Sequence, residues 1–172
     1  MKNEELPCSV NAQPDSSFSI LHSSFLFFGL GTNLGDKEQN LQLAVQKIEE
    51  RIGKVISLSA FYATAPWGFS SENTFLNAAL CVDTSLSPSE ILEITQEIEL
   101  EMGRTHKSVN GAYGDRVIDI DLLLYGDLIL DTPELKLPHP LMQERDFVMR
   151  PLVEIAADVV HPVFGKTIRE LL

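Results

Sequence analysis

The stretch Phe25–Tyr62, FLFFGLGTNLGDKEQNLQLAVQKIEERIGKVISLSAFY, decides the fold because it contains two different periodicities. It begins with Phe25–Phe28, a bulky apolar run typical of a buried strand, and a glycine-rich segment expected to form a turn follows. Residues 56–62 alternate with period two, which predicts a second strand. Between the two strands, apolar side chains at three- and four-residue spacing predict a one-sided helix that ends at Gly53; they are Leu41, Ala44, Val45, Ile48 and Ile52.

The chain beyond this stretch repeats the strand, helix and strand order. Phe75–Asp83 alternates as a strand that places Phe75 and Asn77 on one face. Ser87–Glu90 is a capping box with proline at the first helical position, and its helix is expected to run to Gly103. Two further strands are predicted, Val117–Tyr125 and a returning strand over 128–130 after a two-residue hairpin turn, Gly126–Asp127.

This order of elements predicts an α+β fold of the ferredoxin-like, split βαβ type with a largely antiparallel sheet. Two helices should cover one face of the sheet, and an apolar stretch around residues 152–157 should pack on the other, so helices are expected on both faces. Residues 1–24, rich in Ser and Pro, are predicted to be a flexible N-terminal tail, and residues 25–172 a single domain.

Composition excludes several classes of protein. Thirteen Lys and Arg against 25 Asp and Glu give 13 − 25 = −12, a charge that repels phosphate backbones, so we expect no nucleic-acid binding. No apolar run approaches the roughly 18 residues of a membrane span, and the first residues lack a signal-peptide pattern. Cys8 and Cys81 have no CxxC spacing, which favours a reducing compartment and predicts a cytoplasmic protein.

The sharpest chemical signal is the pair Asp119 and Asp121, because side chains two apart on a strand point the same way, roughly 7 Å apart. Their repulsion, roughly 2 kcal/mol at an effective dielectric near 20, is reversed by a divalent cation between them. Oxygen ligands of this kind suit Mg²⁺ completed by substrate phosphates. The alternative, weighed about equally for an isolated DxD, is that both carboxylates pair with Arg104 or Arg116 at the sheet surface.

Other candidates are weaker when taken singly. No glycine-rich nucleotide fingerprint is present, so phosphate binding would need side chains in or beside the two long connections, 63–74 and 104–115, and these include Arg104, Lys107, Arg116 and Arg145. Each could equally be a solvated surface group. His139 lies between two prolines, where a structural turn is the simpler interpretation, and Trp67, Phe75 and Phe147 could simply be core. Asn77 among apolar neighbours needs polar partners, which an amide-like heterocycle could supply.

These residues belong to separated motifs that resemble the 6-hydroxymethyl-7,8-dihydropterin pyrophosphokinase family of folate biosynthesis, from Phe25 to Arg169. The motifs are Gly29–Gly35, Phe61–Gly68, Phe75–Ala79, Glu97–Arg104, Arg116–Gly126, Pro138–Pro140, Arg145–Val148 and Pro151–Leu152.

The resemblance implies an enzyme that transfers the β,γ-diphosphate of ATP to the pterin hydroxymethyl oxygen and releases AMP. It implies two Mg²⁺ ions on Asp119 and Asp121, with Arg104 and Arg116 as further catalytic residues on the phosphates. The implied ATP site comprises Gln96, Glu99, Arg104, Arg116, His139 and Arg145. The implied pterin site comprises Thr64, Ala65, Trp67, Phe75, Asn77 and Phe147.

The sequence departs from the family pattern at His106, where a second loop arginine is common, because neutral His adds no charge at pH 7. Some relatives are fused to dihydropteroate synthase, so a functional or covalent link to that enzyme is an implied partnership. Two other functions stay open: a different Mg²⁺-dependent phosphoryl or nucleotidyl transferase, and a ligand-binding regulatory module without turnover.

Overall fold

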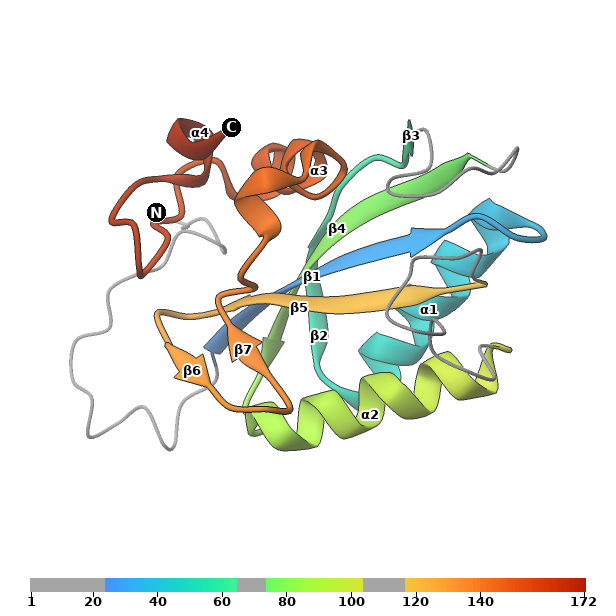
Figure 1. The fold of residues 1–172 in the computed structure, drawn as a ribbon. Helices are drawn as coiled ribbons and strands as arrows, with labels where there is room; N and C mark the ends of the chain where they lie inside the picture. The colour runs from blue at the N-terminus through green and yellow to red at the C-terminus, as the bar shows by residue number, and fades with distance from the viewer. Residues whose placement is uncertain (1–23, 65–73, 104–116) are drawn as a thin grey trace, which may run out of the picture.

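The computed structural model describes residues 24–64, 74–103 and 117–172 (Figure 1). The predicted tail lies outside these ranges except for Ser24, which begins the first strand. In chain order the elements are β1 (Ser24–Thr32), α1 (Lys37–Arg51), β2 (Lys54–Leu58), β3 (Tyr62–Thr64), β4 (Phe75–Thr84), α2 (Pro88–Glu101), β5 (Asp119–Tyr125), β6 (Leu130–Asp131), β7 (Lys136–Leu137), the 3-10 helix η4 (Met142–Glu144), α3 (Asp146–Ala156) and α4 (Ile168–Leu171).

The main sheet has the strand order β2-β4-β1-β5. Strand β3 also pairs with β4, at residues 75–77, whereas β2 pairs with residues 80–83. Every pairing in it is antiparallel. Strand β4 lies between β2 and β1, which α1 connects, and β1 lies between β4 and β5, which α2 connects. This is the predicted split βαβ arrangement, and the α+β ferredoxin-like fold is confirmed.

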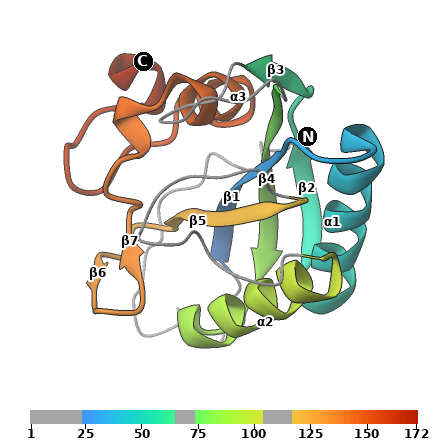
Figure 2. The ribbon, with the colours of Figure 1, turned by 45° about the vertical axis from the view of Figure 1, so that its right-hand side comes forward.

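Alternation along the central strands produces two apolar cores. Phe28, Leu30 and Leu80 face a core shared with α1 and α2, whereas Phe27 and Cys81 face a core shared with α3. Figure 2 shows α1 and α2 on one side of the sheet and α3 on the other. The helices on both faces are therefore as predicted, including the packing of the apolar stretch in α3 against the second face.

The first residues of α1 and α2 are set by N-cap hydrogen bonds. Asp36 accepts a hydrogen bond from the Gln39 backbone N–H (3.2 Å) at the start of α1, and Gly35 provides the left-handed turn before it (φ 74°). Ser87 and Glu90 form both bonds of the predicted capping box in front of α2. Both helices thus start at positions set by short local hydrogen bonds.

The strand predicted over residues 56–62 is wrong in one respect, because the structure breaks it into β2 and β3. Ser59 sits at the break: its N–H donates to the Ala79 carbonyl (2.9 Å), and its hydroxyl accepts from the Ala79 N–H (2.9 Å). The next N–H, of Ala60, turns away to Glu154 on α3. The polar contacts of Ser59 and Ala60 therefore redirect the chain, and period-two alternation does not reveal such a break.

The predicted hairpin after β5 is also wrong, since the strand that follows the turn does not return along β5. It pairs instead as β6 with β7 in a separate two-stranded sheet. The outer edge of β5 has other partners: the Ile120 N–H donates to Glu99 Oε2 (2.8 Å), and the Leu123 carbonyl accepts from the His139 N–H (2.9 Å). Helix α2 and the segment after β7 thus occupy the edge that a hairpin would need.

Candidate active site

A pocket opens on the α3 side of the sheet, where β1, β3, β4 and β5 approach the start of α3. Its walls come from segments far apart in the sequence. The residues that line it are Gly29, Leu30, Gly31, Thr64, Phe75, Asn77, Ala78, Asp119, Asp121, Arg145, Phe147 and Val148. Seven of the residues predicted for the pterin, the metal or ATP are brought together here: Thr64, Phe75, Asn77, Asp119, Asp121, Arg145 and Phe147.

Two glycines of the central strand β1 form the floor of this pocket. Gly31 pairs with Asn77 on one side and with Asp119 on the other, and Gly29 pairs with Asp121. The expectation that these glycines form a turn is therefore wrong, because both lie within β1. Since neither carries a side chain, the amide on β4 and the carboxylates on β5 face each other across an open strip.

The amide of Asn77 is buried and held in place. Asn77 is 4% exposed, and its Nδ2 donates to Thr64 Oγ1 over 2.8 Å. A Cβ atom added at Gly31 would come within 2.9 Å of Asn77 Oδ1, closer than real Cβ contacts. The amide thus has a fixed partner on β3 and needs glycine on β1 beside it.

The aromatic side chains of the pocket come from two different elements. Phe75 stands on β4 beside Asn77, and Phe147 stands in the first turn of α3. The guanidinium carbon of Arg145 lies 5.9 Å from the centroid of the Phe147 ring, within the range of a cation–π contact. Arg145 is only 8% exposed, so this positive charge is presented to the pocket rather than to bulk solvent.

The carboxylates of Asp119 and Asp121 supply the acidic side of the pocket. Both are partly exposed on β5 and line the same cavity, as the alternation predicted. Within residues 24–64, 74–103 and 117–172, no three His, Cys, Asp or Glu side chains gather closely enough to hold a metal ion by themselves. Two hard oxygen donors at an open cavity fit a magnesium ion that takes its remaining ligands from water and substrate phosphates.

Three other residues predicted for ATP, Gln96, Glu99 and His139, lie within the described ranges, along the outer edge of β5 and outside the pocket lining. Glu99 on α2 accepts from the Ile120 N–H, and Gln96 is exposed one turn before it. His139 lies on the other part of this edge, where its Nδ1 accepts from the Leu141 N–H (3.2 Å). Burial, with a smaller contribution from Arg145, lowers the pKa of His139 to about 4, so its ring is neutral at pH 7.

Four predicted site residues lie outside the described ranges, namely Ala65, Trp67, Arg104 and Arg116. Conversely, the sequence reasoning missed the pocket roles of Gly29, Gly31 and Val148. The signal for the glycines was present in their alternation with Phe28 and Leu30, which are buried on the opposite face of β1. The part of the chain that the structure describes contains no helix long and apolar enough to cross a membrane.

Fold and pocket together define an α+β domain of the ferredoxin-like type with a small-molecule site whose apolar and acidic sides meet at the central strand. Residues 27–157 match the family described as 7,8-dihydro-6-hydroxymethylpterin-pyrophosphokinase (HPPK). The chain belongs to this family, which makes it a pyrophosphokinase with ATP as co-substrate.

Relatives cover most of the chain. A 2-amino-4-hydroxy-6-hydroxymethyldihydropteridine pyrophosphokinase of Porphyromonas gingivalis is 48% identical over 134 residues, which are 77% of this chain and 91% of the relative. The enzyme of the same name from Aquifex aeolicus is 39% identical over 145 residues, 84% of this chain and 88% of the relative.

Solved structures agree in fold. A crystal structure of Plasmodium falciparum HPPK-DHPS superimposes with a TM-score of 0.69 at 17% identity and covers 87% of this chain. This chain spans 44% of the length of that protein. The likeness extends the family assignment to the arrangement of strands and helices.

Proposed function

We propose that this chain transfers diphosphate from ATP to the hydroxymethyl group of 6-hydroxymethyl-7,8-dihydropterin and releases AMP, as a step of folate biosynthesis. One observation carries the proposal: Gly31 pairs with Asn77 on one side and Asp119 on the other, so the proposed heterocycle site and the proposed phosphate site would adjoin. A hydroxymethyl group on a heterocycle in the first would point its oxygen toward phosphates in the second. Placement of this kind supplies much of the rate enhancement in phosphoryl-type transfers.

The pterin is assigned to the side of the pocket lined by Phe75, Asn77 and Phe147. Two aromatic side chains from different elements suit a flat ring stacked between them, and each such contact contributes about 0.5–1.5 kcal/mol beyond area burial. The Asn77 amide offers a donor and an acceptor to the polar ring edge, and Thr64 fixes its orientation. Ala65 and Trp67, which lie one and three residues after Thr64 in the sequence, are proposed to complete this side.

The triphosphate is assigned to the acidic side, where Asp119 and Asp121 would hold two Mg²⁺ ions. When bound, such ions offset the negative charge of the phosphates and favour in-line attack at the β-phosphorus. The carboxylates would hold the cations on the pocket side of β5. Without cations, their charges would repel the triphosphate.

Arginines are proposed to stabilise the charge on the transferred diphosphate and on AMP. Arg145 is supported by its buried position in the pocket lining, whereas Arg104 and Arg116 are supported by the family motifs that contain them. The nucleotide base is assigned to the outer edge of β5, beside Gln96, Glu99 and His139. A neutral His139 ring would form hydrogen bonds with the base there without repelling the positive charge of Arg145.

Three further proposals concern the chain as a whole. Residues 1–24 are proposed as a tail and residues 25–172 as the catalytic domain; the start of β1 at Ser24 supports this boundary to within one residue. A cytoplasmic location is supported by the two cysteines without CxxC spacing. A link to dihydropteroate synthase is supported by HPPK-DHPS fusions among the solved relatives.

The direct test measures AMP formation from ATP and Mg²⁺, with and without 6-hydroxymethyl-7,8-dihydropterin. AMP that forms only with the pterin supports the proposal. ADP formation, or nucleotide turnover without the pterin, would instead indicate a different phosphoryl or nucleotidyl transferase. Pterin and ATP binding without any turnover would indicate a regulatory module.

A further inference from the structure

A carboxylate outside the pocket joins two of its walls. Glu154 lies on α3, about two turns beyond Phe147, and receives three contacts from two residues: Ala60, between β2 and β3, and Tyr62, the first residue of β3. The Tyr62 hydroxyl donates to Glu154 Oε1 (2.6 Å), and the Ala60 N–H lies 3.1 Å from Oε1 and 3.2 Å from Oε2. Hydrogen bonds to a charged carboxylate are stronger than those between neutral groups.

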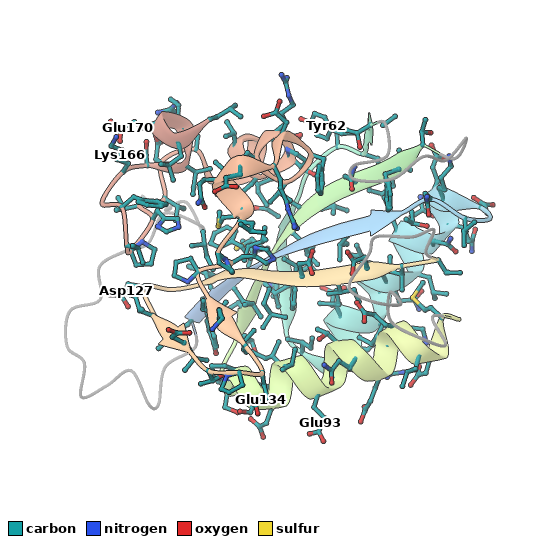
Figure 3. All side chains as sticks on the ribbon, viewed as in Figure 1. Tyr62, Glu93, Asp127, Glu134, Lys166 and Glu170 are labelled. Atoms are coloured by element: carbon teal, nitrogen blue, oxygen red, sulfur yellow. The ribbon has the colours of Figure 1, made fainter. Side chains whose placement is uncertain are left out.

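The strand that Glu154 holds is the one that carries Thr64. Tyr62 pairs with Asn77 and Thr64 pairs with Phe75 across the β3–β4 ladder, so these four side chains share the α3 face of the sheet. Strand β3 is only three residues long, and β4 is its only partner strand among the described residues. Figure 3 shows Tyr62 beside α3, at the end of the molecule where β3 and α3 approach each other.

We infer that Glu154 and Tyr62 are positioning residues that set the distance between the Thr64–Asn77 wall and the Phe147 wall of the pterin pocket. The inference rests on the proposed function, because it assigns a role within the proposed pterin site. Thr64 orients Asn77, and Phe147 belongs to the same helix as Glu154. A displacement of β3 from α3 therefore changes both the orientation of the Asn77 amide and the width of the pterin pocket.

Electrostatics agree with this geometry. The hydrogen bond to Glu154 is the largest cause that raises the pKa of Tyr62, so the hydroxyl stays protonated and continues to donate. The contact lies at the surface rather than in the core, so its removal should loosen the pocket without unfolding the protein.

The test uses Tyr62→Phe, which removes one hydroxyl, and Glu154→Gln, which removes the charge, together with the double variant. Each single variant is expected to weaken pterin binding about three- to tenfold, as loss of a charge-assisted hydrogen bond at a partly exposed position would. The KM for ATP and kcat should stay within about twofold of the unmutated protein. In the double variant the effects should be less than multiplicative, because Tyr62→Phe removes the Tyr62–Glu154 bond and Glu154→Gln weakens that same bond by removing the charge.

Glu93→Gln is the matched control, because Glu93 is exposed on α2 and points into solvent in Figure 3. It should leave pterin binding unchanged. Unchanged pterin affinity in both Tyr62→Phe and Glu154→Gln would overturn the inference and leave the proposed function intact. Equal losses of pterin affinity, ATP affinity and kcat would also overturn it, as evidence for general destabilisation. Absence of pterin binding by the unmutated protein would refute the proposed function, and the inference with it.

Discussion

Asp119 and Asp121 are the residues whose loss should be most severe. Asp119→Asn or Asp121→Asn removes one of two carboxylate charges from the pocket side of β5, so we expect turnover to fall by at least about 100-fold. The fold should persist because both side chains are partly exposed. Asp127→Asn, in the exposed turn after β5, is the control and should keep full activity (Figure 3). Undiminished Mg²⁺-dependent activity in either site variant would defeat the metal assignment.

Substitution of Asn77 tests the proposed pterin side of the pocket. Asn77→Leu leaves polar atoms of the ring edge without partners, which costs about 1–3 kcal/mol, whereas Phe147→Leu loses the stacking preference of about 0.5–1.5 kcal/mol and keeps apolar bulk. Pterin affinity measured by calorimetric titration should therefore fall at least as much in Asn77→Leu as in Phe147→Leu. Both variants should still bind a non-hydrolysable ATP analogue with Mg²⁺. Full pterin affinity in Asn77→Leu would remove the basis for placing the ring there.

Gly31 and Gly29 provide a matched pair on one strand. A methyl group at Gly31 would lie 2.9 Å from Asn77 Oδ1, whereas one at Gly29 would meet Leu123 Cδ1 at 3.5 Å, an ordinary contact. Gly31→Ala should displace the amide and weaken pterin binding by about tenfold, equivalent to roughly 1.4 kcal/mol, while Gly29→Ala should change it by less than about threefold. Similar pterin affinities for the two variants would contradict the steric argument.

The sequence predicted the strand face of individual side chains correctly where period-two alternation alone determines it. Phe75 and Asn77 were expected on one face of a strand, and the structure places both in the pocket. The prediction for Gly29 and Gly31 was wrong because glycines in a short apolar run are compatible with either a turn or a strand. Only the pairing of β1 with β4 and β5 shows that these two glycines lie in a strand.

At the scale of elements, helices were predicted more reliably than strand partners. The ends of α1 and α2 follow from caps formed within a few residues, and such local bonds can be recognised in the sequence. The break between β2 and β3 depends on Ala79 and Glu154, and the pairing of β6 depends on what occupies the edge of β5. Those contacts join distant segments, so local patterns cannot predict them.

The pair of helices on one face is joined by an exposed ion pair with a predictable pH dependence. Glu101 on α2 accepts from both guanidinium nitrogens of Arg51 on α1 (2.8 and 2.6 Å) and from Lys47 (3.1 Å). The Arg51 bond, followed by the Lys47 bond, lowers the pKa of Glu101 from 4.5 to about 2. A carboxylate whose pKa is lower in the folded state stabilises that state at pH values above its pKa in the unfolded chain. This stabilisation is lost as the pH falls through the pKa of the folded state.

We therefore expect Glu101→Gln to be less stable than the unmutated protein above about pH 4.5, with the difference shrinking toward pH 2. Because the pair is exposed, added salt should reduce the difference as well. Thermal unfolding across this pH range measures it. A stability difference that grows as the pH is lowered would contradict the assigned direction of the pKa shift.

At the scale of the whole molecule, the split βαβ topology explains why the two sides of the site adjoin. The central strand β1 has β4 on one side and β5 on the other, so the β4 residues proposed to bind the pterin and the carboxylates of β5 are separated by one strand. Helix α3 then closes the pocket from the second face with Arg145 and Phe147. The order of elements in the sequence predicted this topology, but the role of α3 as a pocket wall required the tertiary packing.

The most direct test of the central claim is mass spectrometry of the pterin product after incubation with ATP and Mg²⁺. If the two sides of the pocket hold the substrates as proposed, the hydroxymethyl pterin gains two phosphate groups in one step and AMP appears in equal amount. A pterin that carries one phosphate with ADP as co-product, or one that carries the AMP group with release of diphosphate, would contradict attack at the β-phosphorus and with it the proposed arrangement.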